Sequence, residues 1–245
     1  MKRLLLEMAR WAEALKNTLP PRLEEWLMDV FFLYCPIWVV CQFWREADGY
    51  LKLHRPKKGQ VVIDVGAWKG HFTLVASRLV GREGWVVAIE PQRDICHRLT
   101  IRLKRLGIKN VKVEHSALYS EEKEVVLTKR NDSSFNLFGT ATGEAEVEQV
   151  RLISLDRLLG SLKLKSIDYV KMDIEGAELE ALLGARETIR LHRPFFAIAS
   201  YHRRDGEATS SRVEKILSSF GYSVKTGYKW HITTWGWYEK GESVR

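Results

Sequence analysis

From residue 60 onward, short runs rich in apolar and β-branched residues alternate with stretches of helical periodicity. Two parallel strands need a crossover of a dozen or more residues between them, and that crossover is usually a helix. The strand-like runs occupy 59–66, 85–91, 110–118, 167–176 and 195–202, and the helical stretches 69–80, 92–107, 154–159, 177–190 and 210–220. This order predicts an α/β domain with a mainly parallel sheet that helices cover on both faces.

Two pairs of strand-like runs have no helix between them. Residues 221–226 and 229–239 end the pattern and predict an antiparallel pair at one edge of the sheet. Residues 123–129 and 147–155 suit a hairpin, and the polar, Gly- and Ser-rich residues between them predict a long loop. Because loops of that length are commonly functional, we expect the loop 129–147 to be an acceptor lid, especially at Ser133, Ser134, Phe135 and Asn136.

The first 55 residues follow another pattern, so we divide the chain into a helical and aromatic appendage, 1–55, and a main domain, 56–245. Residues 26–44 are the most apolar stretch, but Asp29 and Pro36 leave less than the ~20 uninterrupted residues of a membrane span. Pro36 predicts two shorter helices instead.

Three roles stay open for the aromatic side chains of 26–44: packing on the main domain, lining an acceptor pocket, or peripheral contact with a membrane. These side chains are Trp26, Phe31, Phe32, Trp38, Phe43 and Trp44. A homodimer through the same segment is equally compatible with the sequence, because large apolar surfaces are rarely left in water.

The net charge of +8 favours anionic partners, and the densest basic cluster lies in residues 93–112. Arg98, Arg102, Arg105 and Lys109 recur there at helical spacing, as expected either for a solvated helix face or for a surface that binds RNA. The three cysteines lack the spacing of a disulfide framework or a zinc site, and the first residues lack the features of a signal peptide. We therefore expect a cytoplasmic protein.

Residues 62–73, V-I-D-V-G-A-W-K-G-H-F-T, place Gly66 after a buried strand and Gly70 where a helix opens. Glycine allows the backbone to approach a ligand closely, and a helix start presents free N–H groups. Glu90 ends the next strand, where an acid can accept hydrogen bonds from ribose hydroxyls. The spacing departs from the dinucleotide fingerprint and from the P-loop. It therefore favours an adenosine joined to a small zwitterion, with Asp64 orienting the loop or pairing with an ammonium group.

The string K-M-D-I-E-G places Lys171, Asp173 and Glu175 on one side of a strand end. Two carboxylates there could act as a general base, as ligands of a divalent ion or as acceptors for an ammonium group. One of them could instead cap the next helix. His202, at the end of the following strand, could accept a proton, since its ordinary pKa is near ~6.5. We assign no metal site.

Five stretches together resemble S-adenosylmethionine-dependent methyltransferases of the FkbM type: DVGAWKGHFT, AIEPQ, HSALYSEE, ISLDRLL and DYVKMDIEGAELEALLGA. The resemblance covers about residues 60–202, and the D-x-E-G-A-E string is its most specific part. It implies a Rossmann-like class I fold with a seven-stranded mixed sheet, its last strand antiparallel, and S-adenosylmethionine as cofactor. The donor-binding residues that it implies are Asp64, Gly66, Ala67, Gly70, Thr73, Glu90, Pro91, Ser116, Ala117 and Asp173.

The chain departs from the family pattern at two places. Trp68 stands where the family usually has Asn, and Ala199-Ser200-Tyr201-His202 stands where it often has Ile-Glu-x-His. Because family members mostly methylate oxygen of sugars and natural products, we expect O-methylation of a small-molecule, sugar or lipid-linked acceptor. The expected catalytic side chains are Asp173, Glu175, His202 and Lys171. RNA methylation and a binding scaffold without turnover are the alternatives.

Overall fold

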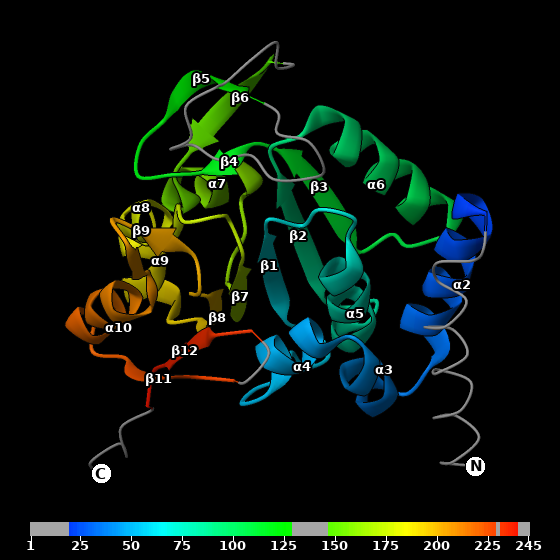
Figure 1. Cartoon of the computed structure of the whole chain (residues 1–245), viewed down its shortest axis with the longest axis horizontal. Coiled ribbons are helices and arrows are strands. Elements are labelled where there is room, and N and C mark those ends of the chain that lie inside the picture. Colours follow the sequence, from blue (N-terminus) through cyan, green and yellow to red (C-terminus); the bar gives the residue numbers. More distant parts are fainter. Residues whose placement is uncertain (1–19, 129–146, 229–230, 240–245) are drawn as a thin grey trace.

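A seven-stranded sheet forms the centre of the computed structural model, which describes residues 20–128, 147–228 and 231–239 (Figure 1). In sheet order the strands are β11 (Ser223–Gly227), β12 (Thr233–Trp237), β8 (Phe195–Ala199), β7 (Tyr169–Met172), β1 (Val61–Val65), β2 (Trp85–Glu90) and β3 (Val111–His115). Neighbours from β8 to β3 are parallel, whereas β12 is antiparallel to both β8 and β11. The predicted mixed sheet and its antiparallel edge pair are confirmed.

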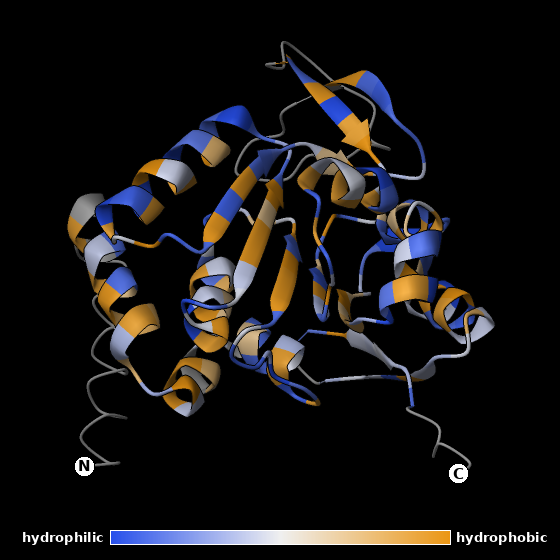
Figure 2. Cartoon of the chain, turned by 180° about the vertical axis from the view of Figure 1, so that it is seen from behind, coloured by the Kyte–Doolittle hydropathy of each residue, from blue (hydrophilic) through white to orange (hydrophobic). Residues whose placement is uncertain are grey.

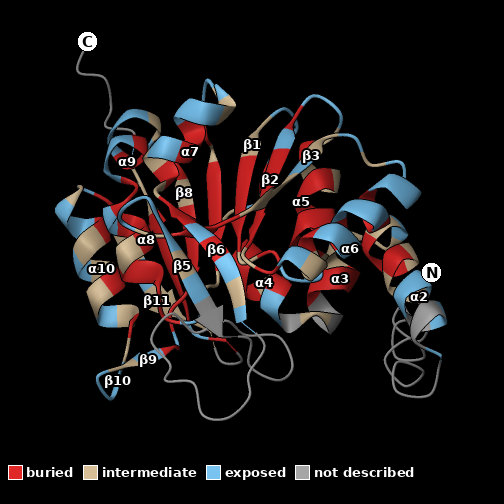
Figure 3. Cartoon of the chain, turned by 90° about the horizontal axis from the view of Figure 1, so that it is seen from above, coloured by how far each residue is buried: buried red, intermediate tan, exposed pale blue. Residues whose placement is uncertain are grey.

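Helices cover both faces of this sheet (Figure 3). The helices α5 (His71–Val80) and α6 (Arg93–Arg105) lie on one face, and α7 (Leu155–Leu162), α8 (Glu178–Leu183), α9 (Arg186–His192) and α10 (Ser210–Ser219) on the other. Side chains of β1 alternate between the two hydrophobic clusters, with Val62 in the first and Ile63 and Val65 in the second. Burial on both sides explains why the central strands are mostly hydrophobic (Figure 2).

One expected helix is divided in two. The sequence predicts a single helix over 177–190, but α8 ends at Leu183 and α9 begins at Arg186. Asp156 stabilises the start of α9, because its carboxylate accepts hydrogen bonds from the backbone N–H groups of Glu187 and Thr188 in the first turn. Helical periodicity alone cannot reveal a cap that comes from elsewhere in the chain.

A smaller three-stranded sheet lies beside the end of β2. It contains β4 (Ala117–Leu118), β6 (Val147–Ile153) and β5 (Lys123–Thr128). The pairing of β5 with β6 is antiparallel, which confirms the hairpin-like match. The four residues assigned to an acceptor lid lie outside the described residues. A short ribbon of β9 (Arg203–Arg204) and β10 (Glu207–Ala208) follows β8.

The appendage contributes α2 (Pro21–Tyr34), α3 (Ile37–Phe43) and α4 (Arg45–Leu51), and Pro36 separates the first two as expected. Its buried side chains belong to the same hydrophobic cluster as strand residues of the sheet. The hydroxyl of Tyr169 donates to the carbonyl of Tyr50 at 2.6 Å, and the indole of Trp235 donates to the carbonyl of Gly49 at 2.9 Å. The appendage therefore packs on the sheet, while the boundary at residue 55 stays a prediction.

The aromatic side chains of 26–44 divide between core and surface. Phe31 and Phe32 are buried, Trp38 and Trp44 are partly buried, and Trp26 is 54% exposed; the side chain of Phe43 lies outside the described set. Among the described helices, none combines the length and hydrophobicity that crossing a bilayer requires. Peripheral membrane contact and a homodimer stay predictions.

Candidate functional site

A cavity opens at the carboxyl ends of β1, β2 and β7. The chain crosses to opposite sides of β1 in forming β2 and β7, and such a switch point is where open α/β sheets bind ligands. Its described lining residues are Glu46, Val65, Gly66, Trp68, Ile89, Glu90, Pro91, Gln92, Ser116, Ala117, Leu118, Asp173, Ile174, Glu175, Ala177 and Tyr201. They include six of the ten predicted donor-binding residues, namely Gly66, Glu90, Pro91, Ser116, Ala117 and Asp173.

The loop between β1 and α5 needs glycine at two positions because of its own conformation and packing. Gly66 and Gly70 both have φ above +70°, which residues other than glycine rarely adopt. A Cβ on Gly66 would lie 1.9 Å from the carbonyl oxygen of Asp173, and one on Gly70 would lie 2.3 Å from Leu99. The glycines therefore let the residue that follows β7, and α6, pack against this loop, and the close approach of a ligand to Gly66 stays a prediction.

Glu90 is buried in the cavity wall at the end of β2. Its carboxylate accepts hydrogen bonds from the backbone N–H groups of Trp68, at 2.8 Å, and Gln92, at 3.1 Å. Burial raises the pKa of Glu90 to about 7, although both hydrogen bonds act in the opposite direction. Trp68 has φ +46° and is 38% exposed, so the loop turns sharply at the position that departs from the family pattern.

Ser116 supplies a buried hydroxyl to the same wall. Only 4% of the residue is exposed, and its Oγ has no hydrogen-bond partner among the described residues. A buried polar group without a partner is costly, so this hydroxyl suits a ligand that hydrogen-bonds to it. The wall therefore fits the nucleoside part of S-adenosylmethionine, since Glu90 can hydrogen-bond to the sugar and Ser116 to the base.

Three predicted site residues lie beneath the loop instead of in the cavity wall. Asp64 is fully buried, with one carboxylate oxygen 3.1 Å from Nζ of Lys171 and the other accepting from the hydroxyl of Thr73 at 2.6 Å. Lys171 also donates to the carbonyls of Val65 and Gly66, at 3.2 and 2.7 Å. These contacts fix the end of β1 from below. Ala67 and Gly70 likewise belong to the loop but not to the described cavity lining.

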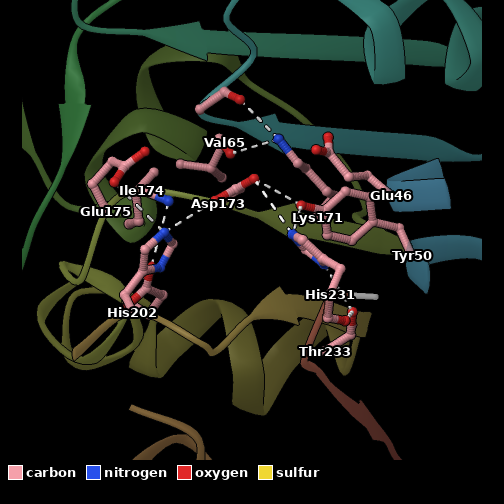
Figure 4. Close-up of polar contacts among 12 residues, drawn as sticks. Glu46, Tyr50, Val65, Lys171, Asp173, Ile174, Glu175, His202, His231 and Thr233 are labelled. Carbon is pink, nitrogen blue, oxygen red and sulfur yellow. Dashed lines mark hydrogen bonds and ion pairs between the residues drawn. The ribbon is translucent and has the colours of Figure 1, made fainter. Parts of the chain in front are cut away.

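Asp173 is the centre of a polar network on the floor of the cavity (Figure 4). The hydroxyl of Tyr50 donates to its Oδ2 at 2.8 Å, and Nε2 of His231 lies 3.1 Å from that hydroxyl. On the other side, Nε2 of His202 lies 3.5 Å from Oδ1. Tyr50 and His231 could not be identified from the sequence, because neither belongs to a motif and the fold alone brings them to Asp173.

The two histidines that flank Asp173 have different environments. Burial lowers the pKa of His202, but the close approach of Glu178, whose carboxylate lies 2.8 Å from Nδ1, and the charges of Glu178, Asp173 and Glu175 outweigh burial and raise it. The pKa of His231 is lowered, mainly by burial. His202 therefore tends to carry a proton and a positive charge, whereas His231 tends to be neutral. His202 does not line the cavity; it lies behind Asp173 and Glu175.

Glu175 lines the cavity beyond Asp173, in a turn and not in a strand. Strand β7 ends at Met172, and Glu175 has φ +56°. Burial raises the pKa of its carboxyl group. Neither predicted carboxylate caps the next helix: α8 has no side-chain cap, and Glu178, its first residue, accepts from the backbone N–H of Gly176 in the preceding turn at 3.1 Å. Both predicted carboxylates thus stay directed at the cavity.

Some of the basic side chains along α6 form ion pairs within the protein. Arg102 is buried and its Nε lies 2.6 Å from the carboxylate of Asp29, while Arg105 contacts the same carboxylate at 2.7 Å. Two of the four side chains on which the prediction of an RNA-binding surface rests therefore hold α2 against α6. Among the described residues, no group of three or more His, Cys, Asp or Glu side chains is arranged to hold a metal ion.

Comparison with known proteins agrees with this geometry. Residues 64–224 match the family model of the methyltransferase FkbM domain. The crystal structure of the methyltransferase FkbM from Methylobacillus flagellatus superposes with a TM-score of 0.59 and 20% identity, covering 92% of this chain and 58% of that one. Fibrillarin from Aeropyrum pernix, crystallised with S-adenosyl-L-methionine, gives a TM-score of 0.52 and 13% identity over 78% of this chain and 74% of fibrillarin.

Among curated proteins, the AMB antimetabolite synthetase AmbE of Pseudomonas aeruginosa is 28% identical over 204 residues, 67% of this chain and 10% of AmbE. A protein-L-isoaspartate O-methyltransferase of Thermotoga maritima is 43% identical over 54 residues, 22% of this chain and 17% of that enzyme. The chain thus spans only a small part of these curated relatives. Since the family model covers most of the chain, the protein belongs to the FkbM methyltransferase family, whose members have the class I fold and use S-adenosylmethionine as cofactor.

Proposed function

We propose that this protein transfers a methyl group from S-adenosylmethionine to a hydroxyl oxygen of a small-molecule, sugar or lipid-linked acceptor. The observation that carries the proposal is that one cavity is lined by two carboxylates with different roles. Glu90 is placed to accept hydrogen bonds from ribose hydroxyls, and Asp173 is placed to act on the acceptor. Gly66, Pro91, Ser116 and Ala117 complete the donor side. When bound, the cofactor supplies an activated methyl group that leaves its sulfur as the acceptor oxygen attacks.

Asp173 accepts the proton that the acceptor hydroxyl loses. Tyr50 donates to one oxygen of this carboxylate and so fixes its direction, and Nε2 of His202 lies 3.5 Å from the other oxygen. Because the Tyr50 hydroxyl proton is directed at Asp173, Nε2 of His231 donates to the Tyr50 oxygen. In this arrangement Lys171 and Asp64 hold the loop that the donor rests on.

The mouth of the cavity favours an acceptor that is uncharged or cationic. Glu46 and Glu175 lie there with the aromatic side chains of Trp68 and Tyr201, and the described lining contains no Lys or Arg. Lys69, whose ammonium is 4.6 Å from the centre of the Trp68 ring, does not line it. Carboxylates repel a phosphate, whereas carboxylates beside aromatic rings suit hydroxyl-rich or ammonium-bearing compounds. This charge pattern argues against RNA as the acceptor.

The test is a methyl-transfer assay with radiolabelled S-adenosylmethionine on cell extract that ion exchange has separated into anionic, neutral and cationic pools. We expect label in a neutral or cationic pool with the wild-type protein and none with Asp173→Asn. Label in the RNA-containing pool would support RNA methylation instead. Donor binding without label in any pool would support the binding scaffold.

Replacing Tyr50 with Phe should slow methyl transfer while donor binding is retained. The variant keeps the buried ring but removes the hydrogen bond to Asp173. A hydrogen bond to a charged group contributes about 1.5–3 kcal/mol, and the loss of that amount from the transition state slows a reaction roughly tenfold or more. The measurement is kcat with the labelled pool, together with the dissociation constant of S-adenosylhomocysteine. Tyr222→Phe is the matched control, since it removes a buried hydroxyl bonded to Pro194, remote from the cavity. Equal kcat in both variants would exclude a role for the Tyr50 hydroxyl.

Donor affinity should rise with pH through about 7, the pKa of buried Glu90. The ionised carboxylate accepts hydrogen bonds from both ribose hydroxyls, whereas protonation takes away part of that capacity. Between pH 6 and pH 8 we expect an increase of up to roughly tenfold in affinity for S-adenosylhomocysteine, measured by titration calorimetry. Glu90→Gln cannot ionise and should bind weakly with no such rise. The same rise in that variant would assign the pH dependence to another group.

A further inference from the structure

Asp29, on α2, is a buried carboxylate that the proposed reaction does not use. Only 1% of the residue is exposed, and it pairs with two guanidinium groups of α6, those of Arg102 at 2.6 Å and Arg105 at 2.7 Å. A carboxylate so far from water requires such partners, and the loss of one partner leaves the other charge uncompensated. This ion pair therefore fixes the position of α2 against α6.

Arg102 also connects this ion pair to the donor loop. Its Nη1 donates to the backbone carbonyl of Lys69, which lies between Trp68 and Gly70. Trp68 holds the left-handed conformation noted above, and from that position its N–H reaches the carboxylate of Glu90. One buried guanidinium thus links α2, α6 and the loop segment that orients the ribose-binding acid.

A second set of contacts joins the same helix to the same loop. The ring of Phe32 stacks on His71, the first residue of α5, with 4.8 Å between ring centres, and His71 meets the Trp68 ring edge-on at 5.9 Å. Arg78 of α5 donates to the carbonyls of Phe32 and Cys35 at the end of α2. Figure 1 shows α2 beside both α5 and α6. The C-terminal half of α2 is therefore held against α6 through Asp29, and against α5, which follows the donor loop, through Phe32 and Cys35.

We propose that α2 is a tether for the donor loop, and that Asp29 and Arg102 are positioning residues that hold residues 66–70 in the conformation that binds S-adenosylmethionine. The inference rests on the proposed function, because it assumes that the donor lies on this loop. It gives the appendage a role that the family match does not cover, since that match begins at residue 64. Donor affinity then depends on a side chain outside the cavity.

The experiment measures binding of S-adenosylhomocysteine by titration calorimetry, and hydrogen exchange of the loop amides, in the full chain. Asp29→Asn keeps the shape but removes the charge. Arg102→Lys keeps a cation near Asp29 but cannot also reach the Lys69 carbonyl. We expect each to weaken binding by roughly tenfold, a common size for coupling between sites, and to speed exchange at residues 66–70. Arg98→Gln is the control, because Arg98 is on the same helix, is 81% exposed and pairs only loosely with Asp94.

A second measurement needs no variant. Because coupling is reciprocal, donor binding to the wild-type protein should slow hydrogen exchange in α2, so the test holds even if a variant fails to fold. Unchanged exchange in α2, or wild-type affinity and loop exchange in Asp29→Asn and Arg102→Lys, would overturn the tether and leave the proposed function standing. If the wild-type protein does not bind S-adenosylhomocysteine, both proposals are wrong.

Discussion

Replacing Asp173 with Asn is expected to lower kcat for methyl transfer by roughly 10²–10⁴-fold, the usual contribution of a general base. Asn has the same shape and can still accept the Tyr50 hydrogen bond, but it cannot take up a proton. The fold and the affinity for S-adenosylhomocysteine should therefore stay close to those of the wild type. The measurements are kcat with the labelled pool, the dissociation constant and the thermal midpoint.

Asp205→Asn is the matched control for this prediction, because Asp205 is exposed and pairs with Arg212 away from the cavity. Its kcat should equal that of the wild type. Full turnover by Asp173→Asn would remove Asp173 from the chemistry. A loss of donor binding as large as the loss of rate would make Asp173 a donor ligand instead, which is the other role that the sequence suggests.

The largest effect on stability is expected from Gly66→Ala. The added Cβ would lie 1.9 Å from the carbonyl oxygen of Asp173, and φ is +72°. The left-handed backbone and the forced separation of β1 from β7 together should cost roughly 2–5 kcal/mol. Because the shift moves Asp173, donor binding and methyl transfer should be lost as well. Differential scanning calorimetry should show a fall in Tm of roughly 4 to 20 °C.

Gly59→Ala separates the two causes. Gly59 has φ +81°, but a Cβ there would meet no atom within 4 Å. This variant should therefore show only the backbone cost of about 1–2 kcal/mol and should bind S-adenosylhomocysteine normally. If the two variants lose equal stability, the close approach of Asp173 to Gly66 does not constrain the loop.

Local patterns in the sequence predict the order of helices and strands and much of the cavity wall. Glu90 is the last residue of β2, Ser116 and Asp173 directly follow β3 and β7, and the parallel topology brings those strand ends to one edge. The positions of these residues can be predicted from the sequence pattern because each lies at the end of a strand that the pattern itself predicts.

Long-range contacts could not be predicted in the same way. Tyr50 lies 123 residues from Asp173 and 181 from His231, and only the packing of α4 on the sheet brings the three together. The prediction that all four basic side chains of 93–112 share one open surface was wrong for a related reason. Periodicity shows that Arg102 and Arg105 share a face but not that Asp29 of α2 pairs with both. Dividing the chain at residue 55 also hid the contribution of the appendage to the cavity floor.

A crystal structure with S-adenosylhomocysteine would show whether the cavity between the ends of β1, β2 and β7 binds the methyl donor. We expect both ribose hydroxyls on the carboxylate of Glu90, the base beside Ser116 and the sulfur facing Asp173. A nucleoside bound elsewhere, or a cavity that remains closed to it at saturating concentration, would rule out this donor site.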